Sequence, residues 1–391
     1  MVELGRGLLP LWALEDGITF LNHGSYGATP REVTAEADRW RARLESQPVR
    51  FFNDELPGAT RAAAATLAGF VGVPPDRLGF VENASDGTNA VLRSIRWREG
   101  DEILTTSHVY NAVRKNLAWL STMTGVVCVE AMVPFPTPDD ASVVDGIARA
   151  ITPRTRLILV DHIASASAVV LPLPAIVALA RSHGIPVLVD GAHGPGMMDL
   201  DVDAIGADWY VGNCHKWLAS PKGSAFIVAS ANPAWEVHPT VISHSYGMGF
   251  AAEFDKIGTR DYAPWLATPA AIAFHARLGG PVLRARNVDL ARRNAVRIAA
   301  ELGTQTGAPP AMFGSIATIR LPWDGPVDWD VARLLRQRLW ERTRIELHVT
   351  ALAGAWWARI SAAAYNEDGD YAGLAAALKD TITTTRTGTS A

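Results

Sequence analysis

Residues 185–193, IPVLVDGAH, pass from an apolar run into a carboxylate, a glycine and a histidine. A segment that is apolar throughout is typical of a strand in the middle of a parallel sheet with helices on both faces. Residues 209–217, WYVGNCHKW, form a second such segment, which ends close to Lys216. Because parallel sheets bind ligands at the carboxyl ends of their strands, Asp190 and Lys216 are the first candidates for a functional site.

The same alternation of apolar runs and helical stretches extends from about residue 78 to residue 230. Strands are expected at 78–82, 102–106, 126–130, 157–161, 186–190, 209–212 and 225–229. Helices are expected between them, near 86–97, 110–123, 140–150 and 173–183. This order predicts an α/β fold whose large domain contains a mainly parallel, seven-stranded sheet.

The pattern changes after about residue 264. Helices are expected at 264–277, 282–302, 328–341 and 366–379, and strands at 316–321, 345–349 and 356–360. This mixture predicts a smaller α+β domain, formed by residues 1–19 and 266–391, beside a large domain of residues 20–265. The end of the chain, residues 381–391, is expected to fray.

The composition limits the possible functions. Of the 391 residues, 48% are hydrophobic and 19% charged, which is enough apolar material for a large core and excludes general disorder. The net charge of −4 argues against a nucleic-acid partner. Two cysteines, Cys128 and Cys214, are too few for a disulfide framework and indicate a cytoplasmic protein. No signal peptide or membrane-spanning run is expected.

The candidate site begins with Lys216, which follows a strand predicted to be buried. Burial lowers the pKa of a lysine amine and makes it available for Schiff-base chemistry, although a lysine at a strand end can also simply reach solvent. Asp190 strengthens the first interpretation, because an ionised carboxylate can hold the protonated nitrogen of a pyridine ring. Its alternative role is an ordinary helix cap.

A phosphate site is suggested by residues 82–89, ENASDGTN, which lie between a predicted strand and a predicted helix. Ser85 and the first amides of the helix could hold a phosphate at the helix N-terminus. The same residue types also form common turns, and the anionic Asp86 is an objection. An amine, a carboxylate and a phosphate cradle together fit pyridoxal phosphate (PLP).

These motifs resemble the class V aminotransferase group of fold-type-I PLP enzymes, and most closely the isopenicillin N epimerase-like proteins. The resemblance rests on residues 189–196 (VDGAHGPG), 212–217 (GNCHKW) and 221–223 (PKG). Further matches lie at 21–27 (LNHGSYG), 48–52 (PVRFF), 258–261 (GTRD), 359–361 (RIS) and 365–366 (YN). They follow the order of the family from about residue 20 to residue 366, and they imply a PLP-dependent enzyme.

The resemblance assigns roles around the cofactor. Lys216 carries PLP as a Schiff base and later moves the Cα proton, and Asp190 pairs with the pyridine nitrogen. His193 takes the place of the residue that bonds the phenolic oxygen of the ring, unless it is only a packed histidine. The remaining contacts are implied for Ser85 and the Ala84 amide with the phosphate, His215 beside them, Tyr110 stacked on the ring, and Ser165 near the phenolic oxygen.

The resemblance also implies a substrate site and a partner subunit. Arg359 is expected to clamp a carboxylate, because its guanidinium matches that group geometrically; a structural ion pair is the alternative. Asn22, His23 and Arg50 are expected to line the substrate pocket, or else to serve as turn and packing residues. Thr259 lies where a partner subunit supplies a phosphate ligand, which implies a homodimer with a shared active site.

The reaction is left open among several outcomes. A thiol-based desulfurase is disfavoured, because Cys128 and Cys214 both fall in segments predicted to be buried. With Lys216 as the one evident base, we expect C–S bond cleavage of an S-cysteine conjugate in small-molecule, antibiotic-type biosynthesis. An amino-acid epimerase is the alternative, followed by decarboxylative or oxidative deamination of a cysteine conjugate.

Two other classes of protein remain possible from the sequence. Asp190, His193 and His215 could be ligands of a zinc hydrolase, although this leaves Lys216 without a role. A non-catalytic binding protein with the same fold would have little need for Lys216. The prediction is therefore an enzyme with PLP and no metal.

Overall fold

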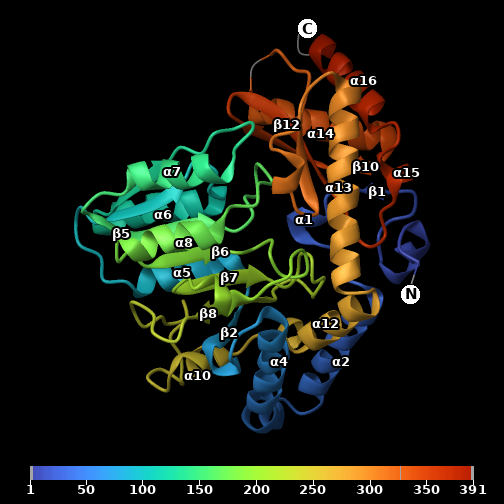
Figure 1. The fold of residues 1–391 in the computed structure, drawn as a ribbon. Helices are drawn as coiled ribbons and strands as arrows, with labels where there is room; N and C mark the ends of the chain where they lie inside the picture. Colours follow the sequence, from blue (N-terminus) through green and yellow to red (C-terminus); the bar gives the residue numbers. More distant parts are fainter. Residues whose placement is uncertain (1–2, 326, 389–391) are drawn as a thin grey trace.

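A seven-stranded sheet forms the centre of the larger lobe of the molecule (Figure 1). The structure is a computed structural model, and it describes residues 3–325 and 327–388. The strands of this sheet are β2 (Leu78–Val81), β3 (Glu102–Thr106), β4 (Val127–Ala131), β5 (Thr155–Asp161), β6 (Val187–Asp190), β7 (Trp209–Asn213) and β8 (Ala225–Ala229). They lie in the order β2-β8-β7-β6-β5-β3-β4. The predicted seven-stranded α/β sheet is confirmed.

The sheet is parallel from β4 to β7, and β8 runs antiparallel to both β7 and β2. Strand β8 reverses direction because only residues 214–224 separate it from β7, too few for a helical crossover. The loop therefore folds back at the carboxyl edge of the sheet. It carries Lys216.

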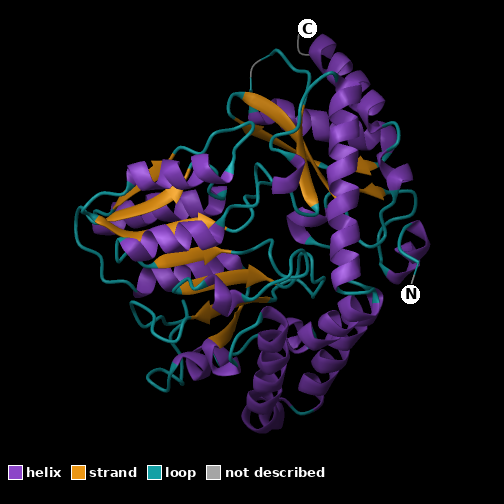
Figure 2. Ribbon diagram, in the orientation of Figure 1, coloured by secondary structure: helices purple, strands orange, loops and turns teal. Residues whose placement is uncertain are grey.

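Helices cover both faces of this sheet (Figure 2). They include α5 (Ala84–Ser94), α6 (Asn111–Thr124), α7 (Asp140–Ala150) and α8 (Leu173–Ser182). Strands β6, β7 and β8 are buried along their whole length, as their apolar sequences predict. Strand β4 differs: it is an edge strand, so Cys128 is only partly buried and not, as expected, inside a buried strand.

A three-stranded antiparallel sheet forms the second lobe. Its order is β11 (His348–Leu352), β12 (Ala355–Ser361) and β9 (Ile316–Arg320). The long helix α13 (Pro281–Leu302) packs against β9, and α14 (Trp329–Thr343) against β11. Strand β1 (Thr19–Phe20) pairs with β10 (Ile345–Glu346), so the start of the chain joins its C-terminal part. The exact domain boundaries stay a prediction.

The remaining elements are short helices and a helical base. Helices α2 (Arg31–Ser46), α4 (Leu56–Val71) and α12 (Thr268–Arg277) pack together at the bottom of Figure 1. The short ones are η1 (Arg6–Leu11), α1 (His23–Tyr26), α3 (Pro48–Arg50), η2 (Phe51–Glu55), η3 (Pro75–Arg77), α9 (Val202–Ile205), α10 (Phe250–Asp255), α11 (Ala263–Leu266), η4 (Pro310–Met312) and α15 (Asp368–Tyr371).

The expected fraying after residue 380 is wrong for residues 381–388, which continue α16 (Leu374–Gly388). Thr381, Ile382 and Thr385 are buried, and α16 packs against α13 and α14. The threonine hydroxyls also donate to carbonyls one turn back, which offsets their poor helix propensity. Residues 389–391 lie outside the described residues.

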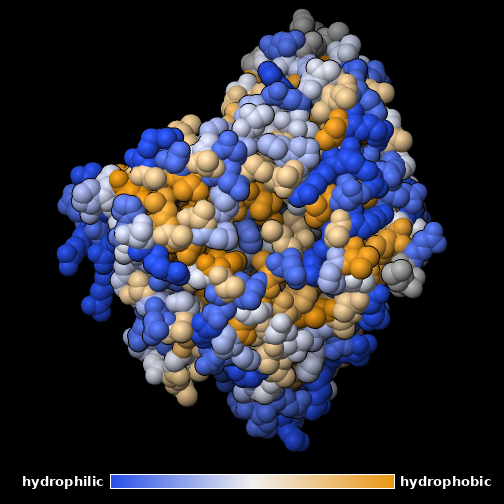
Figure 3. Space-filling view, in the orientation of Figure 1, coloured by the Kyte–Doolittle hydropathy of each residue, from blue (hydrophilic) through white to orange (hydrophobic). Residues whose placement is uncertain are grey.

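Hydrophilic side chains cover the periphery of the face shown in Figure 3, and apolar ones are visible mainly toward its middle, where the two lobes meet. Among the described residues, no helix is both long and apolar enough to cross a membrane.

Candidate active site

A cavity of about 470 Å³ lies at the carboxyl edge of the parallel strands. It is formed by the segments that follow β2, β3, β5, β6 and β7, together with α1. Its lining residues are Ser25, Tyr26, Glu82, Asn83, Ala84, Ser85, Tyr110, Asp161, Ile163, Ser165, Asp190, Ala192, His193, Asn213, His215, Lys216, Lys222 and Gly223. The structure thus brings together most of the residues that the sequence singled out.

Lys216 is 9% exposed, and no acidic side chain among the described residues forms an ion pair with it. Burial, and then the nearby Arg359, lower the pKa of Lys216 to about 8. Its Nζ lies 3.1 Å from His193 Nε2, and the other ring nitrogen of His193 accepts a hydrogen bond from Trp217 Nε1 at 3.2 Å. Lys216 is therefore a buried amine that is easily deprotonated, as Schiff-base chemistry requires.

Asp190 ends β6 and lines the same cavity as Lys216. One of its oxygens accepts the Ala192 amide at 3.0 Å, and no hydrogen bond among the described residues occupies the other. Burial raises the pKa of Asp190. A cationic ring nitrogen bound there would stabilise the ionised carboxylate, which is the partnership that a pyridine cofactor needs.

The N-terminus of α5 provides Ser85, whose hydroxyl and amide have no hydrogen-bond partner among the described residues. Ala84 departs from the expectation: its amide donates to Asn213 Oδ1 at 2.8 Å and is not free for a phosphate. Asp86 is not an obstacle, because its carboxylate accepts the Thr240 hydroxyl at 2.7 Å and does not line the cavity. Ser85 is thus the available anion ligand at this helix end.

His215 lies beside this helix end, and its Nδ1 lies 3.1 Å from the Ser224 carbonyl. Since a carbonyl only accepts, Nδ1 carries the proton and Nε2 is left with a lone pair. Burial lowers the pKa of His215 to about 4, so the ring is neutral in the free protein. His215 can therefore bind an anion only after taking up a proton, which a phosphate dianion would favour.

Arg359, on β12, is buried and has no acidic partner among the described residues. Its Nη1 donates to the Ser165 carbonyl (2.6 Å) and hydroxyl (3.0 Å), and its Nη2 donates to the Ser25 hydroxyl (3.0 Å). Burial lowers the pKa of Arg359 to about 10. The alternative of a structural ion pair therefore finds no support, and a ligand carboxylate would satisfy this charge.

Five of the predicted residues do not line the cavity of this chain: Arg359 lies behind two of its lining serines, and the other four are Asn22, His23, Arg50 and Thr259. Asn22 Oδ1 accepts the Ser25 hydroxyl at 2.6 Å, and His23 bonds the Lys216 carbonyl at 3.0 Å, so both support residues of the site. The Arg50 side chain is 71% exposed near Asp54, and Thr259 is exposed. Substrate or cofactor contacts by these residues stay predictions.

The predicted site residues did not include Asp161, Lys222 and Tyr26, which also line the cavity, although Lys222 and Tyr26 lie in motifs that matched the family. Asp161 ends β5 and pairs in register with Asp190, and its buried Oδ2 has no hydrogen-bond partner in residues 3–325 and 327–388. Burial, and then Asp190, raise the pKa of Asp161 well above its usual value. A signal was available, because Asp161 ends a predicted apolar strand just as Asp190 does.

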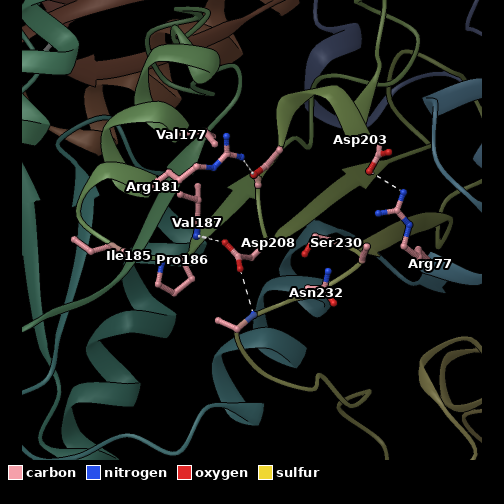
Figure 4. Close-up of a pocket in the computed structure, with 15 residues that line it drawn as sticks. Arg77, Val177, Arg181, Ile185, Pro186, Val187, Asp203, Asp208, Ser230 and Asn232 are labelled. Carbon is pink, nitrogen blue, oxygen red and sulfur yellow. Dashed lines mark hydrogen bonds and ion pairs between the residues drawn. The ribbon is translucent and has the colours of Figure 1, made fainter.

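A second cavity, of about 560 Å³, lies at the opposite edge of the sheet (Figure 4). Its charges are already satisfied: Arg77 pairs with Asp203 at 2.7 Å, and Asp208 accepts the amides of Val187 and Ala234 at 2.9 and 3.2 Å. Arg181 donates to the Gly206 carbonyl. This cavity is larger, but the described residues that line it offer no unsatisfied buried charge to a ligand.

The sequence of this chain is similar to those of known proteins. The sequence model of the family "Aminotransferase class-V" matches residues 27–336. This chain belongs to the class-V aminotransferase family. Isopenicillin N epimerase from Streptomyces clavuligerus is 34% identical over 93% of this chain and 95% of that protein. A probable chloroplastic L-cysteine desulfhydrase from Arabidopsis thaliana is 30% identical over 93% of this chain and 82% of that protein.

Solved structures confirm the fold-type-I architecture. The cystine C–S lyase C-DES, in complex with its product cysteine persulfide, superposes with a TM-score of 0.82 at 23% identity, over 93% of this chain and 98% of that one. The protein is therefore a PLP-dependent enzyme of the class-V family.

The residues of this class-V chain fit its cofactor. Asp190 and the unpartnered oxygen of Asp161 lie on one side of the cavity and could meet a ring nitrogen, while Ser85 could meet a phosphate. Lys216 is the amine that would bind the aldehyde. For a metal the fit is poor: among the described residues, no three His, Cys, Asp or Glu side chains come close enough to hold an ion.

Proposed function

We propose that this enzyme cleaves the C–S bond of an S-substituted cysteine conjugate by β-elimination, in small-molecule, antibiotic-type biosynthesis. The observation that carries the proposal is the buried guanidinium of Arg359, which has no acidic partner within the described part of the chain and bonds Ser25 and Ser165, two residues that line the cavity with Lys216. This arrangement suits a substrate with both an α-carboxylate and an α-amine. Relatives named cysteine desulfhydrase support the choice of a sulfur substrate.

The residues of the chain have distinct tasks in this reaction. When bound, PLP supplies an electron sink that makes the Cα–H bond acidic. Arg359 holds the substrate carboxylate, whose oxygens replace the serine hydroxyls as hydrogen-bond acceptors of the guanidinium. The Lys216 amine takes the Cα proton, and its lowered pKa suits it to this role near neutral pH. With water, the conjugate then yields a thiol, pyruvate and ammonium.

Neither cysteine supports a persulfide-forming desulfurase. Cys214 is fully buried, and burial raises its pKa to about 12. Cys128 lies on the edge strand β4, outside the cavity lining, and burial followed by the nearby Glu130 raises its pKa. A thiolate nucleophile is therefore not provided where the substrate sulfur would lie.

The alternative function is amino-acid epimerisation of the isopenicillin N epimerase type. One observation favours it: Tyr110 lines the cavity, and burial raises the pKa of its phenol, so it could return a proton to Cα as a second acid. Decarboxylative or oxidative deamination has no comparable support.

The proposal includes a homodimer with a shared active site, in the cytoplasm. Thr259 is exposed, and large exposed apolar side chains gather on the preceding segment, at Val241, Ile242, Tyr246 and Met248. A surface of this kind is typical of a protein interface. If the partner's Thr259 binds the phosphate, PLP occupancy should fall as the dimer is diluted, whereas a fully occupied monomer would contradict this part of the proposal.

The reaction is tested by incubating the holoenzyme with S-benzyl-L-cysteine in deuterated water. We expect thiol, pyruvate and ammonia in equal amounts. An epimerase would instead return the intact amino acid with deuterium at Cα and both configurations present, and carbon dioxide or peroxide would indicate deamination. A penicillin-type tripeptide, tested in parallel, separates the lyase from the alternative.

A further inference from the structure

Trp217 differs from four other tryptophans in the hydrogen-bond partner of its indole nitrogen. Trp12, Trp97, Trp265 and Trp357 all donate to backbone carbonyls. Trp217 donates instead to a side-chain nitrogen, His193 Nδ1, at 3.2 Å. Three further tryptophans, Trp40, Trp209 and Trp356, have a buried indole nitrogen with no hydrogen-bond partner among the described residues, so packing alone does not require the contact of Trp217 with His193.

The contact determines which nitrogen of His193 carries the proton. An indole N–H can only donate, so Nδ1 must be the acceptor. A neutral imidazole has one donor and one acceptor, which leaves the proton on Nε2. Burial lowers the pKa of His193 well below its usual value, so the ring stays neutral.

The second contact of His193 then determines the protonation state of the Lys216 amine. Nε2 lies 3.1 Å from Lys216 Nζ, and an N–H at Nε2 needs a lone pair opposite it. An ammonium group has no lone pair, whereas a neutral amine has one. The chain Trp217–His193–Lys216 is therefore consistent only with an unprotonated lysine.

We propose that Trp217 is a positioning residue that fixes the Nε2–H tautomer of His193 and thereby stabilises the unprotonated form of the Lys216 amine, the form that binds the aldehyde of PLP. The inference rests on the cofactor site but not on which reaction follows. It assigns a role to a residue that touches neither the cavity nor the substrate.

The surroundings of Trp217 are shaped for this orientation. A Cβ atom at Gly24 would lie 3.1 Å from Trp217 Cζ2, and one at Gly196, where φ is +81°, would lie 2.5 Å from the Trp217 backbone carbon. The ring of His23 lies 5.3 Å away and its Nε2 bonds the Lys216 carbonyl. The indole is thus packed beside Gly24 and His23, and Gly196 leaves room for the backbone of Trp217.

The first test uses Trp217→Phe, which keeps an aromatic ring and removes the N–H. In the cofactor-free full-length chain, we expect the pKa of Lys216, measured by pH-dependent acylation and mass spectrometry, to rise by about one unit, since His193 can then accept from an ammonium group. At pH 7 the rate of chromophore formation with added PLP should fall about tenfold. Trp97→Phe is the matched control and should change neither value.

The variant His193→Gln tests whether Trp217 acts on Lys216 through His193. The glutamine amide can donate a hydrogen bond to Lys216 whether or not Trp217 is present. In that background Trp217→Phe should have no further effect on the Lys216 pKa. An equal shift in both backgrounds, or no shift in Trp217→Phe alone, would overturn the proposal.

The wild-type chain provides a measurement that does not depend on any variant folding. In protein labelled with ¹⁵N-histidine, the resonances missing from His193→Gln identify His193. We expect a protonated Nε2 and an unprotonated Nδ1 at neutral pH. A protonated Nδ1 would overturn the proposal while leaving the proposed reaction untouched.

Discussion

The two cavities at the two ends of the parallel strands are similar in size but opposite in how their charges are satisfied. At the amino ends, in about 560 Å³, Arg77 is paired with Asp203, and Asp208 accepts two amides. At the carboxyl ends, in about 470 Å³ and among the described residues, Lys216 has no acidic partner and Asp161 Oδ2 has no hydrogen-bond partner. Arg359 behind this cavity donates to the hydroxyls of Ser25 and Ser165 and to the Ser165 carbonyl.

This difference identifies the functional site better than cavity size does. A buried, unpaired charge costs several kcal/mol and persists where something outside the folded chain completes it. Paired charges carry no such implication, because they are satisfied whether or not a ligand binds. The larger cavity is thus the less informative one.

The largest expected effect separates two amines within the carboxyl-end cavity. Lys216→Ala should reduce turnover by at least about 10²–10⁴-fold and abolish the chromophore that borohydride fixes to the protein. Lys222→Ala is the matched control: Lys222 lines the same cavity, but its Nζ donates to Thr29. The Lys222→Ala variant should keep the fixed chromophore. A chromophore that is lost in Lys222→Ala and kept in Lys216→Ala would reverse the assignment.

A second large effect compares one aspartate from each cavity. Asp190→Asn should reduce turnover by orders of magnitude, because an amide cannot hold the ring nitrogen protonated, and should change cofactor occupancy much less. Asp208→Asn, at the amino-end cavity, should leave turnover near the wild-type value. Steady-state kinetics and absorption spectra of the two variants check this pair, and equal losses would mean that the cavities do not differ in function.

A smaller effect concerns the stability of the cofactor-free chain. Arg359→Met should raise the free energy of unfolding by about 1 kcal/mol, because it removes a buried unpaired charge. Asp208→Ala should lower it by about 2 kcal/mol, because the amides of Val187 and Ala234 lose their acceptor. Urea unfolding measures both changes, and a fall of the same size in both variants would contradict the comparison.

The smallest effect is a pH dependence at Asp161. Because its pKa is raised in the folded chain, the folded state keeps a proton that the unfolded state has lost, and stability falls as pH rises through the window between the two pKa values. Asp161→Asn removes this contribution. As pH rises, the melting temperature of Asp161→Asn should increase relative to that of the wild type. A difference in melting temperature that stays constant with pH would show that the pKa of Asp161 is not raised.

The sequence predicted the parts of the molecule that depend on local pattern. The seven strands were recognisable because each is an apolar run between helical stretches, and Asp190 and Lys216 stood out because polar residues follow such strands. Strand β4 was placed correctly, but its position at the edge of the sheet depends on strand order, which no single segment encodes. The exposure of Cys128 was missed for that reason.

For a similar reason, the sequence could not predict the hydrogen-bond partners of the site residues. Arg359 meets Ser25 and Ser165, which lie 334 and 194 residues away along the chain. The Ala84 amide is occupied by Asn213, 129 residues away. Contacts of this kind exist only after both lobes have packed, so residue types could suggest roles but not which hydrogen bonds were already used.

The central claim is that Arg359 binds the carboxylate of the substrate. Spectral titration of the holoenzyme with two ligands tests this claim most directly. The ligands are S-benzyl-L-cysteine and S-benzylcysteamine, which lacks only the carboxylate. The wild type should prefer the first by about 10- to 150-fold, the equivalent of a charged hydrogen bond worth about 1.5–3 kcal/mol. Arg359→Met should bind both alike, and Arg181→Met, at the other cavity, should keep the preference. A preference retained in Arg359→Met would contradict the account.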